Sequence, residues 1–415
     1  MAEKQNTPEI RFEGFTDPWE QRKLSSIAAS FDYGLNAAAT EYDGKNKYLR
    51  ITDIDDATHE FLKSNLTTPL ADLAMSADYL LEEGDLLFAR TGASVGKTYL
   101  YRQYDGTVYF AGFLIRARIE ESADPEFVYQ ATLTDAYKKY VAITSQRSGQ
   151  PGVNAQEYAD YQLMLPSRTE QQQIGMTLRS LDSLITLHQR KYDKLCTVKK
   201  SMLDKMFPKP GETEPEVRFK GFTGPWEQRK LGNCGTTYGG LTGKTKEDFG
   251  HGNARFIPYT NVFDNPLTDT KRLEAVEIDS SQNQVVYGDV FFTVSSETPD
   301  EVGMSSVWLS DQEDVYLNSF CFGYRQDSTF DPHYLAYMLR SSLVRSNLTL
   351  LAQGISRFNI SKNKVMELSV PVPSVVEQKQ LGQYFTKLDS LITLHQRKLD
   401  LLKNTKKSLL DKMFV

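Results

Sequence analysis

Residues 9–24, EIRFEGFTDPWEQRKL, return almost unchanged at residues 216–231 as EVRFKGFTGPWEQRKL. Phe12 of the first stretch corresponds to Phe219 of the second, so the repeat is displaced along the chain by 207 residues. Self-similarity at a fixed displacement is the sequence signature of a repeated structural unit. The chain is therefore expected to contain one module twice.

A second pair of repeated stretches has the same displacement. LDSLITLHQRK at 181–191 returns letter for letter at 388–398, and KKSMLDKMF at 199–207 returns as KKSLLDKMF at 406–414. Because the displacement is the same at both ends of the module, no net insertion separates the two copies. This predicts a pseudo-twofold tandem repeat.

The repeated flanks enclose two inserts, 20–166 and 227–373, that hardly match each other. Both inserts are rich in Tyr and Phe and contain short apolar runs bounded by Gly or Asp, such as Asp85–Ala89 and Val285–Val294. Such runs are typical of strands separated by turns. We therefore predict two small domains of mixed or antiparallel sheet plus helices, with one fold and two different surfaces.

A long helix is predicted after each insert. Ser167 with Glu170, and Ser374 with Glu377, form the capping-box pattern of a helix start. Downstream, apolar residues recur at alternating steps of three and four, which is the a/d pattern of a coiled coil. The predicted helix-interface residues are Leu178, Leu181, Ile185, His188, Tyr192, Leu195, Phe385, Leu388, Ile392, His395, Leu399 and Leu402.

The two helices are expected to run antiparallel, because a Pro-rich break at 208–215 lets the chain turn back after the first one. The predicted fold is of the α/β (α+β) class, with two insert domains separated by these two coiled-coil helices. The predicted segments are a leader at 1–19, a first insert domain at 20–166, a first spacer helix at 167–208, a linker and repeated leader at 209–226, a second insert domain at 227–373, and a second spacer helix at 374–415.

Composition places the chain among globular, intracellular proteins. Of its 415 residues 25% are charged and 40% hydrophobic, and no run is apolar and long enough to span a bilayer. The three cysteines stand alone, which disfavours disulfides and structural zinc and fits a reducing cytoplasm. The net charge of −6 argues mildly against a protein that simply coats DNA, because phosphate binding needs Lys and Arg.

The most suggestive catalytic pattern is the stretch RTGASVGKT at 90–98, which resembles a phosphate-binding loop. Gly92 and Gly96 enclose three residues where that motif requires four, and the TYLY that follows favours a strand where the motif requires a helix. The five histidines have no partners at metal-ligand spacing. We therefore predict neither a catalytic residue nor a metal site in this chain.

These features together resemble the specificity subunits of Type I restriction-modification systems. The resemblance rests on the repeated WEQRKL leader, on LPSRTEQ at 165–171 and VPSVVEQ at 372–378, and on the LDSLITLHQRK helix, and it covers essentially the whole chain. It implies that each insert is a target-recognition domain for one half of a split double-stranded DNA site. Because the inserts differ, the site is expected to be asymmetric.

The resemblance also implies partners and cofactors. The repeated helices would set the spacing of the recognition domains and bind two methyltransferase subunits, and two motor/nuclease subunits would join for restriction. S-adenosylmethionine, ATP and Mg would then bind to those subunits, with no cofactor in this chain. An alternative is a coiled-coil scaffold that joins two protein-binding domains without touching DNA, which the acidic pI of about 5.6 favours slightly.

Polar residues in predicted loops are the candidates for DNA contact, because Arg, Lys, Asn, Gln, Ser and Thr contact phosphates and base edges. Residues 152–154 (GVN) and 357–359 (RFN) fall at nearly equivalent places in the two copies. The predicted DNA-binding residues are Arg50, Thr52, Arg90, Thr91, Ser94, Lys97, Gln146, Arg147, Gln150 and Asn154 in the first insert, and Tyr259, Asn261, Ser295, Ser296, Gln353, Arg357 and Asn359 in the second.

Overall fold

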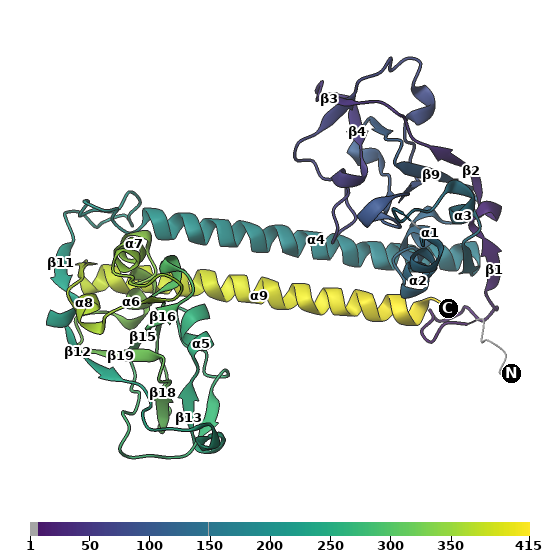
Figure 1. Cartoon of the computed structure of the whole chain (residues 1–415). Helices are drawn as coiled ribbons and strands as arrows, with labels where there is room; N and C mark the ends of the chain where they lie inside the picture. The colour runs from purple at the N-terminus through teal and green to yellow at the C-terminus, as the bar shows by residue number, and fades with distance from the viewer. Residues whose placement is uncertain (1–6, 148) are drawn as a thin grey trace. The chain divides into compact units, whose positions relative to one another are not determined.

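The computed structural model describes residues 7–147 and 149–415, and it divides into two compact units (Figure 1). Unit 1 comprises the described residues of Met1–Arg190 together with Gln396–Val415, and unit 2 comprises Lys191–His395. Each unit thus contains one insert and a segment of each long helix. The predicted boundaries of the recognition domains stay a prediction, because the units combine chain segments from both repeats.

A four-stranded antiparallel sheet forms the centre of unit 1, with the strand order β2-β9-β6-β7. Its strands are β2 (Ala28–Tyr33), β9 (Leu114–Ile119), β6 (Asp85–Ala89) and β7 (Thr98–Leu100). Every residue of β6 is buried, because β6 lies inside the sheet and both of its faces are covered. The other elements are the pairs β1 (Glu20–Lys23) with β10 (Gln162–Leu165), β3 (Ala39–Glu41) with β5 (Thr67–Pro69) and β4 (Lys47–Leu49) with β8 (Val108–Phe110), and the helices α1 (Pro125–Ala131), α2 (Asp135–Thr144) and α3 (Ala155–Ala159).

Unit 2 repeats this plan with the strand order β12-β19-β15-β17. Its strands are β12 (Gly235–Gly239), β19 (Cys321–Gln326), β15 (Val290–Thr293) and β17 (Ser305–Val307). The remaining elements are β14 (Glu274–Val276), β13 (Phe249–Ile257) and β18 (Val315–Leu317) in a second sheet, the pairs β11 (Glu227–Lys230) with β21 (Ser369–Val372) and β16 (Ser295–Ser296) with β20 (Phe358–Asn359), and the helices α5 (Tyr259–Asp264), α6 (Pro332–Met338), α7 (Ser342–Leu350) and α8 (Lys362–Met366). The prediction of two mixed α/β domains with one fold is confirmed.

The two long helices are α4 (Arg168–Lys205) and α9 (Val375–Met413), as the predicted fold requires. Among the described residues, none of the helices is both long and apolar enough to cross a membrane.

The start of α4 confirms only half of the predicted capping box. The Glu170 N–H donates to Ser167 Oγ at 3.4 Å, as expected. The Glu170 carboxylate, however, accepts two hydrogen bonds from Arg11 of the leader, at 2.7 and 2.8 Å. The second repeat has the same buried pair, Arg218 with Glu377, at the same two distances. The glutamates therefore tie each repeated leader to the start of its helix, because a bidentate guanidinium is a stronger partner than a backbone N–H.

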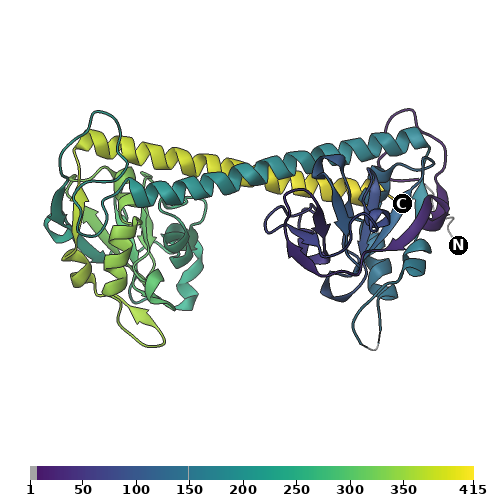
Figure 2. The ribbon, with the colours of Figure 1, turned by 90° about the horizontal axis from the view of Figure 1, so that it is seen from above.

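Within each unit, segments of α4 and α9 lie side by side and run in opposite directions (Figure 2). Lys406 Nζ pairs with Asp182 Oδ1 at 2.5 Å in unit 1, and Lys199 Nζ pairs with Asp389 Oδ1 at 2.5 Å in unit 2. Continued by one step past Leu195 and Leu402, the apolar pattern of the two helices reaches Lys199 and Lys406. These ion pairs explain why a lysine is accommodated there.

None of the twelve predicted helix-interface residues is exposed. Buried members are Leu178, Ile185, Phe385, Leu388 and Leu399, and half-buried members are Leu181, His188, Tyr192, Leu195, Ile392, His395 and Leu402. Leu181 packs against the core of unit 1, and Leu195 against the core of unit 2.

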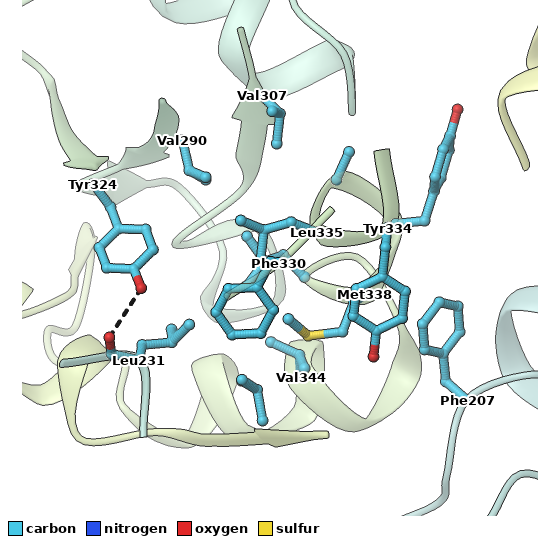
Figure 3. Close-up of a cluster of buried hydrophobic side chains, with 14 of the residues drawn as sticks. Phe207, Leu231, Val290, Val307, Tyr324, Phe330, Tyr334, Leu335, Met338 and Val344 are labelled. Atoms are coloured by element: carbon cyan, nitrogen blue, oxygen red, sulfur yellow. Dashed lines mark hydrogen bonds between the residues drawn. The ribbon is translucent and has the colours of Figure 1, made fainter. Parts of the chain in front are cut away.

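The core of each unit is completed by the end of the helix that belongs to the other repeat. In unit 2, Phe207, just after α4, packs against Trp226, Tyr334 and Phe385, with ring centroids 5.8 to 6.3 Å apart across this cluster. Figure 3 shows Phe207 beside Tyr334 in this core, where Tyr324 also donates a hydrogen bond to the Leu231 carbonyl at 2.9 Å.

Unit 1 has the equivalent arrangement around Phe414. This ring stacks on Phe127 at 5.0 Å and meets Trp19 edge-on at 6.3 Å. The repeated sequence LDKMF is explained by this packing, because its last residue fills the same place in each core.

Phe207→Ala is expected to lower the free energy of unfolding of unit 2 by about 3–5 kcal/mol, because removing a buried phenyl ring forfeits its burial and leaves a cavity. Leu350→Ala in the same unit is the control, since Leu350 is exposed, and it should cost less than about 0.5 kcal/mol. Urea unfolding of the full chain measures both changes. Equal effects of the two substitutions would contradict this description of the core.

Candidate DNA interface

Two loops of unit 1 that carry most of the predicted DNA-binding residues lie against each other. The first loop follows β6 and the second joins α2 to α3. The Val153 N–H donates to the Arg90 carbonyl at 2.9 Å, the Gly92 N–H donates to the Pro151 carbonyl at 3.0 Å, and Thr91 forms an isolated bridge with Gly152. These backbone bonds bring residues about sixty positions apart to one edge of the domain.

Unit 2 builds the same edge from the equivalent loops. The Ile360 N–H donates to the Val294 carbonyl at 2.9 Å, just as Val153 does to Arg90 in unit 1. Ser295 of β16 pairs with Asn359 of β20. The loop after β15 (294–304) and the loop between α7 and α8 (351–361) therefore form a second edge. We call it the reading edge of unit 2. The reading edge of unit 1 is formed by the corresponding loops, 90–97 and the described residues of 145–154.

The register of these bonds places residues 152–154 opposite residues 359–361, two positions beyond the nearly equivalent 357–359. Val153 matches Ile360, so Asn154 corresponds to Ser361 and Gln150 corresponds to Arg357. Asn154 is the N-cap of α3, where its side chain accepts a hydrogen bond from the Glu157 N–H at 2.9 Å.

The reading edge of unit 1 presents one guanidinium and two amides. The Arg90 guanidinium lies over the ring of Tyr33, 4.9 Å from its centroid, and Gln146 and Gln150 are exposed. Thr91 and Ser94 are half-buried beside them. Sequence reasoning missed Tyr33, which is exposed at the end of β2, because only the fold brings it to Arg90.

Three other predicted cations of unit 1 are held by carboxylates. Lys97 is largely buried, and its ammonium contacts Asp56 and the Ile54 carbonyl. Arg50 makes two hydrogen bonds of 2.8 Å to Asp53, which raise the pKa of the guanidinium. Arg147 pairs with Glu157 at 2.5 Å, and Thr52 is exposed on the 3-10 turn next to Arg50. Lys97 is consequently a structural residue, and the other two cations would have to leave their partners to contact a phosphate.

The reading edge of unit 2 has a different set of groups. Gln353, Arg357 and Asn359 are exposed. Ser295 and Ser296 are buried beneath them, and Tyr259 is half-buried, with its hydroxyl donating to the Ser295 carbonyl at 2.7 Å. Burial raises the pKa of Tyr259, so its hydroxyl stays protonated at neutral pH.

Asn261 does not belong to either edge. It is fully buried, and its amide donates to the carbonyls of Asp269 and Arg272 at 2.8 and 3.0 Å. Its oxygen accepts the Asp269 N–H at 3.0 Å. Because these bonds hold the loop after α5, we assign Asn261 a structural role and remove it from the predicted interface.

The stretch at 90–98 lacks the architecture of a phosphate-binding loop. It contains a single 3-10 turn, Gly92–Ser94, and leads into strand β7 at Thr98, as the sequence predicted. A strand, β7, follows this stretch, whereas a phosphate-binding loop would require a helix there. In the part of the chain that the structure describes, no three His, Cys, Asp or Glu side chains meet as ligands for a metal ion.

The fold and the two edges define a class of protein in which one scaffold is used twice to present two different binding surfaces. The model of the family described as Type I restriction modification DNA specificity domain matches residues 16–196 and again residues 224–404. The chain therefore belongs to this family. It is a DNA sequence-specificity subunit with two recognition domains.

Curated relatives and solved structures agree with this assignment. The putative type I restriction enzyme MjaX specificity subunit of Methanocaldococcus jannaschii is 22% identical, over 95% of this chain and 92% of that protein. The type I restriction enzyme MjaVIII specificity subunit of the same organism is 21% identical, over 85% and 83%. The crystal structure of a Type-I restriction-modification system S subunit from M. genitalium has the same fold, with a TM-score of 0.59, 14% identity and 99% coverage of both chains.

Asn261→Ala is expected to lower the free energy of unfolding by about 1–3 kcal/mol, because it removes a buried amide that bonds three backbone groups of the loop after α5. Gln353→Ala is the control, since its exposed side chain can be removed with little effect on stability. Thermal unfolding of the full chain measures the stability of both variants, and only Asn261→Ala should lower it. A stable Asn261→Ala protein with altered DNA preference would return this residue to the interface.

Proposed function

We propose that this chain recognises an asymmetric, split DNA sequence, with the reading edge of each unit contacting one half. The single observation that supports this most is the identical backbone framework of the two edges, Val153 to Arg90 and Ile360 to Val294, carrying different side chains. Where unit 1 has Gln150, unit 2 has Arg357, and where unit 1 has Gly152, unit 2 has Asn359. The two halves of the target should therefore differ in sequence.

The side chains of each edge suit the edges of base pairs. Gln and Asn match the N6 and N7 groups of adenine, and Arg matches the O6 and N7 groups of guanine. A local contact of this kind does not require a basic protein, so the net charge of −6 is compatible with it. Much of the phosphate binding would then come from associated subunits.

We further propose that methyltransferase subunits bind to the outer face of the long helices, one per repeat. Each unit exposes the same pair of leucines there, Leu184 and Leu187 in unit 1 and Leu391 and Leu394 in unit 2. Residues three apart on a helix are neighbours, so each pair forms one apolar patch, and exposed apolar patches mark protein–protein interaction sites. Two equal surfaces would accept two copies of the same partner.

The chemistry would be carried out by the partners, with this chain non-catalytic. Methyl transfer would use S-adenosylmethionine bound to the methyltransferase subunits, and restriction would use ATP and Mg in two motor/nuclease subunits. We propose that the complex acts in the cytoplasm, where its double-stranded DNA target lies.

Arg357→Ala is expected to weaken binding of the target about tenfold or more, because one well-placed guanidinium contributes about 1–3 kcal/mol of base discrimination. The loss should be confined to base pairs in the half-site of unit 2. Arg229→Ala is the matched control, since Arg229 is also exposed but lies on β11, where it pairs with Glu227.

The measurement is the affinity of the complex with its methyltransferase partner for the target duplex and for duplexes mutated in one half. Unchanged affinity and discrimination in Arg357→Ala would contradict the assignment of this edge. Absence of any sequence preference in the wild-type complex would favour the alternative of a scaffold that does not contact DNA.

A further inference from the structure

A tight turn before the central strand β9 or β19 has the same geometry in both units. In unit 1 it spans 111–114, and the Leu114 N–H donates to the Ala111 carbonyl at 2.8 Å. In unit 2 it spans 318–321, and the Cys321 N–H donates to the Asn318 carbonyl at 3.4 Å. The turns have different sequences, AGFL and NSFC, and share only their third residue.

That shared residue is an exposed phenylalanine. Phe113 is 58% exposed and Phe320 is 62% exposed, and they are separated by the displacement of the repeat, 207 residues. Leaving much of a phenyl ring in water forgoes favourable apolar burial. Two inserts that otherwise hardly match keep this unfavourable feature at the same position, although neither ring contributes to a hydrophobic core.

Both phenylalanines are attached directly to a reading edge. The Phe113 carbonyl accepts the Arg90 N–H at 3.0 Å, and the Phe320 carbonyl accepts the Val294 N–H at 3.0 Å. The carbonyls of Arg90 and Val294 in turn accept the hydrogen bonds from the N–H groups of Val153 and Ile360. Each ring therefore projects from a turn that is hydrogen-bonded to the loops that present the polar groups.

Hydrogen bonds to the rest of the domain anchor each turn. The Gly112 N–H donates to the Leu35 carbonyl at 2.9 Å in unit 1. In unit 2 the buried Asn318 side chain donates to the Ile257 carbonyl at 2.9 Å and accepts the Phe320 N–H at 2.8 Å. A ring on a fixed turn loses little conformational freedom when it binds, which makes it suited to recognition.

We propose that Phe113 and Phe320 are specificity-determining residues, each in contact with the C5-methyl group of a thymine in its own half-site. This inference rests on the proposed function of the reading edges. A phenyl ring offers no strong hydrogen bond, so it can discriminate bases in the major groove only through an apolar group, and the thymine methyl is that group. Both halves of the target should therefore contain a thymine whose methyl group contributes to binding.

A protein partner is a weaker explanation for the exposed rings. Their neighbours at the edges include Arg90, Gln150 and Arg357, whose guanidinium and amide groups are those that contact phosphates and base edges. The repeated exposed leucines that suit a protein partner lie on the long helices instead.

The test replaces thymine by uracil, one position at a time, in the target duplex found by mapping methylated bases. This exchange removes one methyl group and leaves base pairing intact. The wild-type complex with its methyltransferase partner should bind about three- to fivefold more weakly when the critical methyl is removed from either half, the loss expected for about 0.8 kcal/mol.

Phe113→Ala should abolish this methyl dependence in the half-site of unit 1 only, and Phe320→Ala in that of unit 2 only. Tyr287→Ala is the control, because Tyr287 is also exposed but precedes β15, at the strand end opposite Val294, and it should leave the dependence intact. Each variant is compared with itself on the thymine duplex and the uracil duplex. A general loss of stability lowers both affinities and leaves their ratio unchanged.

Undiminished methyl dependence in both Phe variants, or no thymine in the wild-type complex that responds to the exchange, would overturn the inference. Loss of methyltransferase binding in the Phe variants with methyl dependence retained would also overturn it and assign the rings to a protein interface. If the wild-type complex does not distinguish the target from a scrambled duplex, the proposed function itself fails, which is a separate outcome.

Discussion

The packing of one phenylalanine into each core is the constraint on which the rest of the structure depends. Phe207 completes the core of unit 2 and Phe414 completes that of unit 1. Phe207 lies just after the end of α4, which begins in the first repeat, and Phe414 lies just after the end of α9, which begins in the second. Neither insert has a complete core until that helix has formed. The helices and leaders must therefore stay alike in the two copies, while loops that contribute nothing to this packing are free to differ.

The buried ion pairs at the helix starts add orientation to this packing. Arg11 with Glu170 and Arg218 with Glu377 join leader and helix through two hydrogen bonds each, in sites from which water is largely excluded. Burying such a pair brings little net stability, whereas removing one partner leaves an uncompensated charge. The pairs consequently fix where each helix begins against its sheet, and with it the position of the loops on that sheet.

Sequence alone was sufficient for the features that depend on local pattern or on repetition. The two helices, the strand Asp85–Ala89 and the doubling of the fold follow from periodicity and from the constant displacement. The site was predicted less well, because exposure is set by contacts distant in sequence. Asn261 was predicted as a loop residue but is hydrogen-bonded inside the domain, and the ammonium of Lys97 is paired with Asp56. Tyr33 and Phe113 lie at the edge only because the fold brings them to Arg90.

The central claim, that the two units recognise different halves of one DNA target, is tested most directly by mapping methylated bases in the genome of a host that carries this chain with its methyltransferase partner. The account predicts one asymmetric motif with two unlike parts separated by a constant number of unspecified base pairs, and exchange of a single insert with that of a relative should change only one part. A continuous or palindromic motif, or a change of both parts after exchanging one insert, would contradict it.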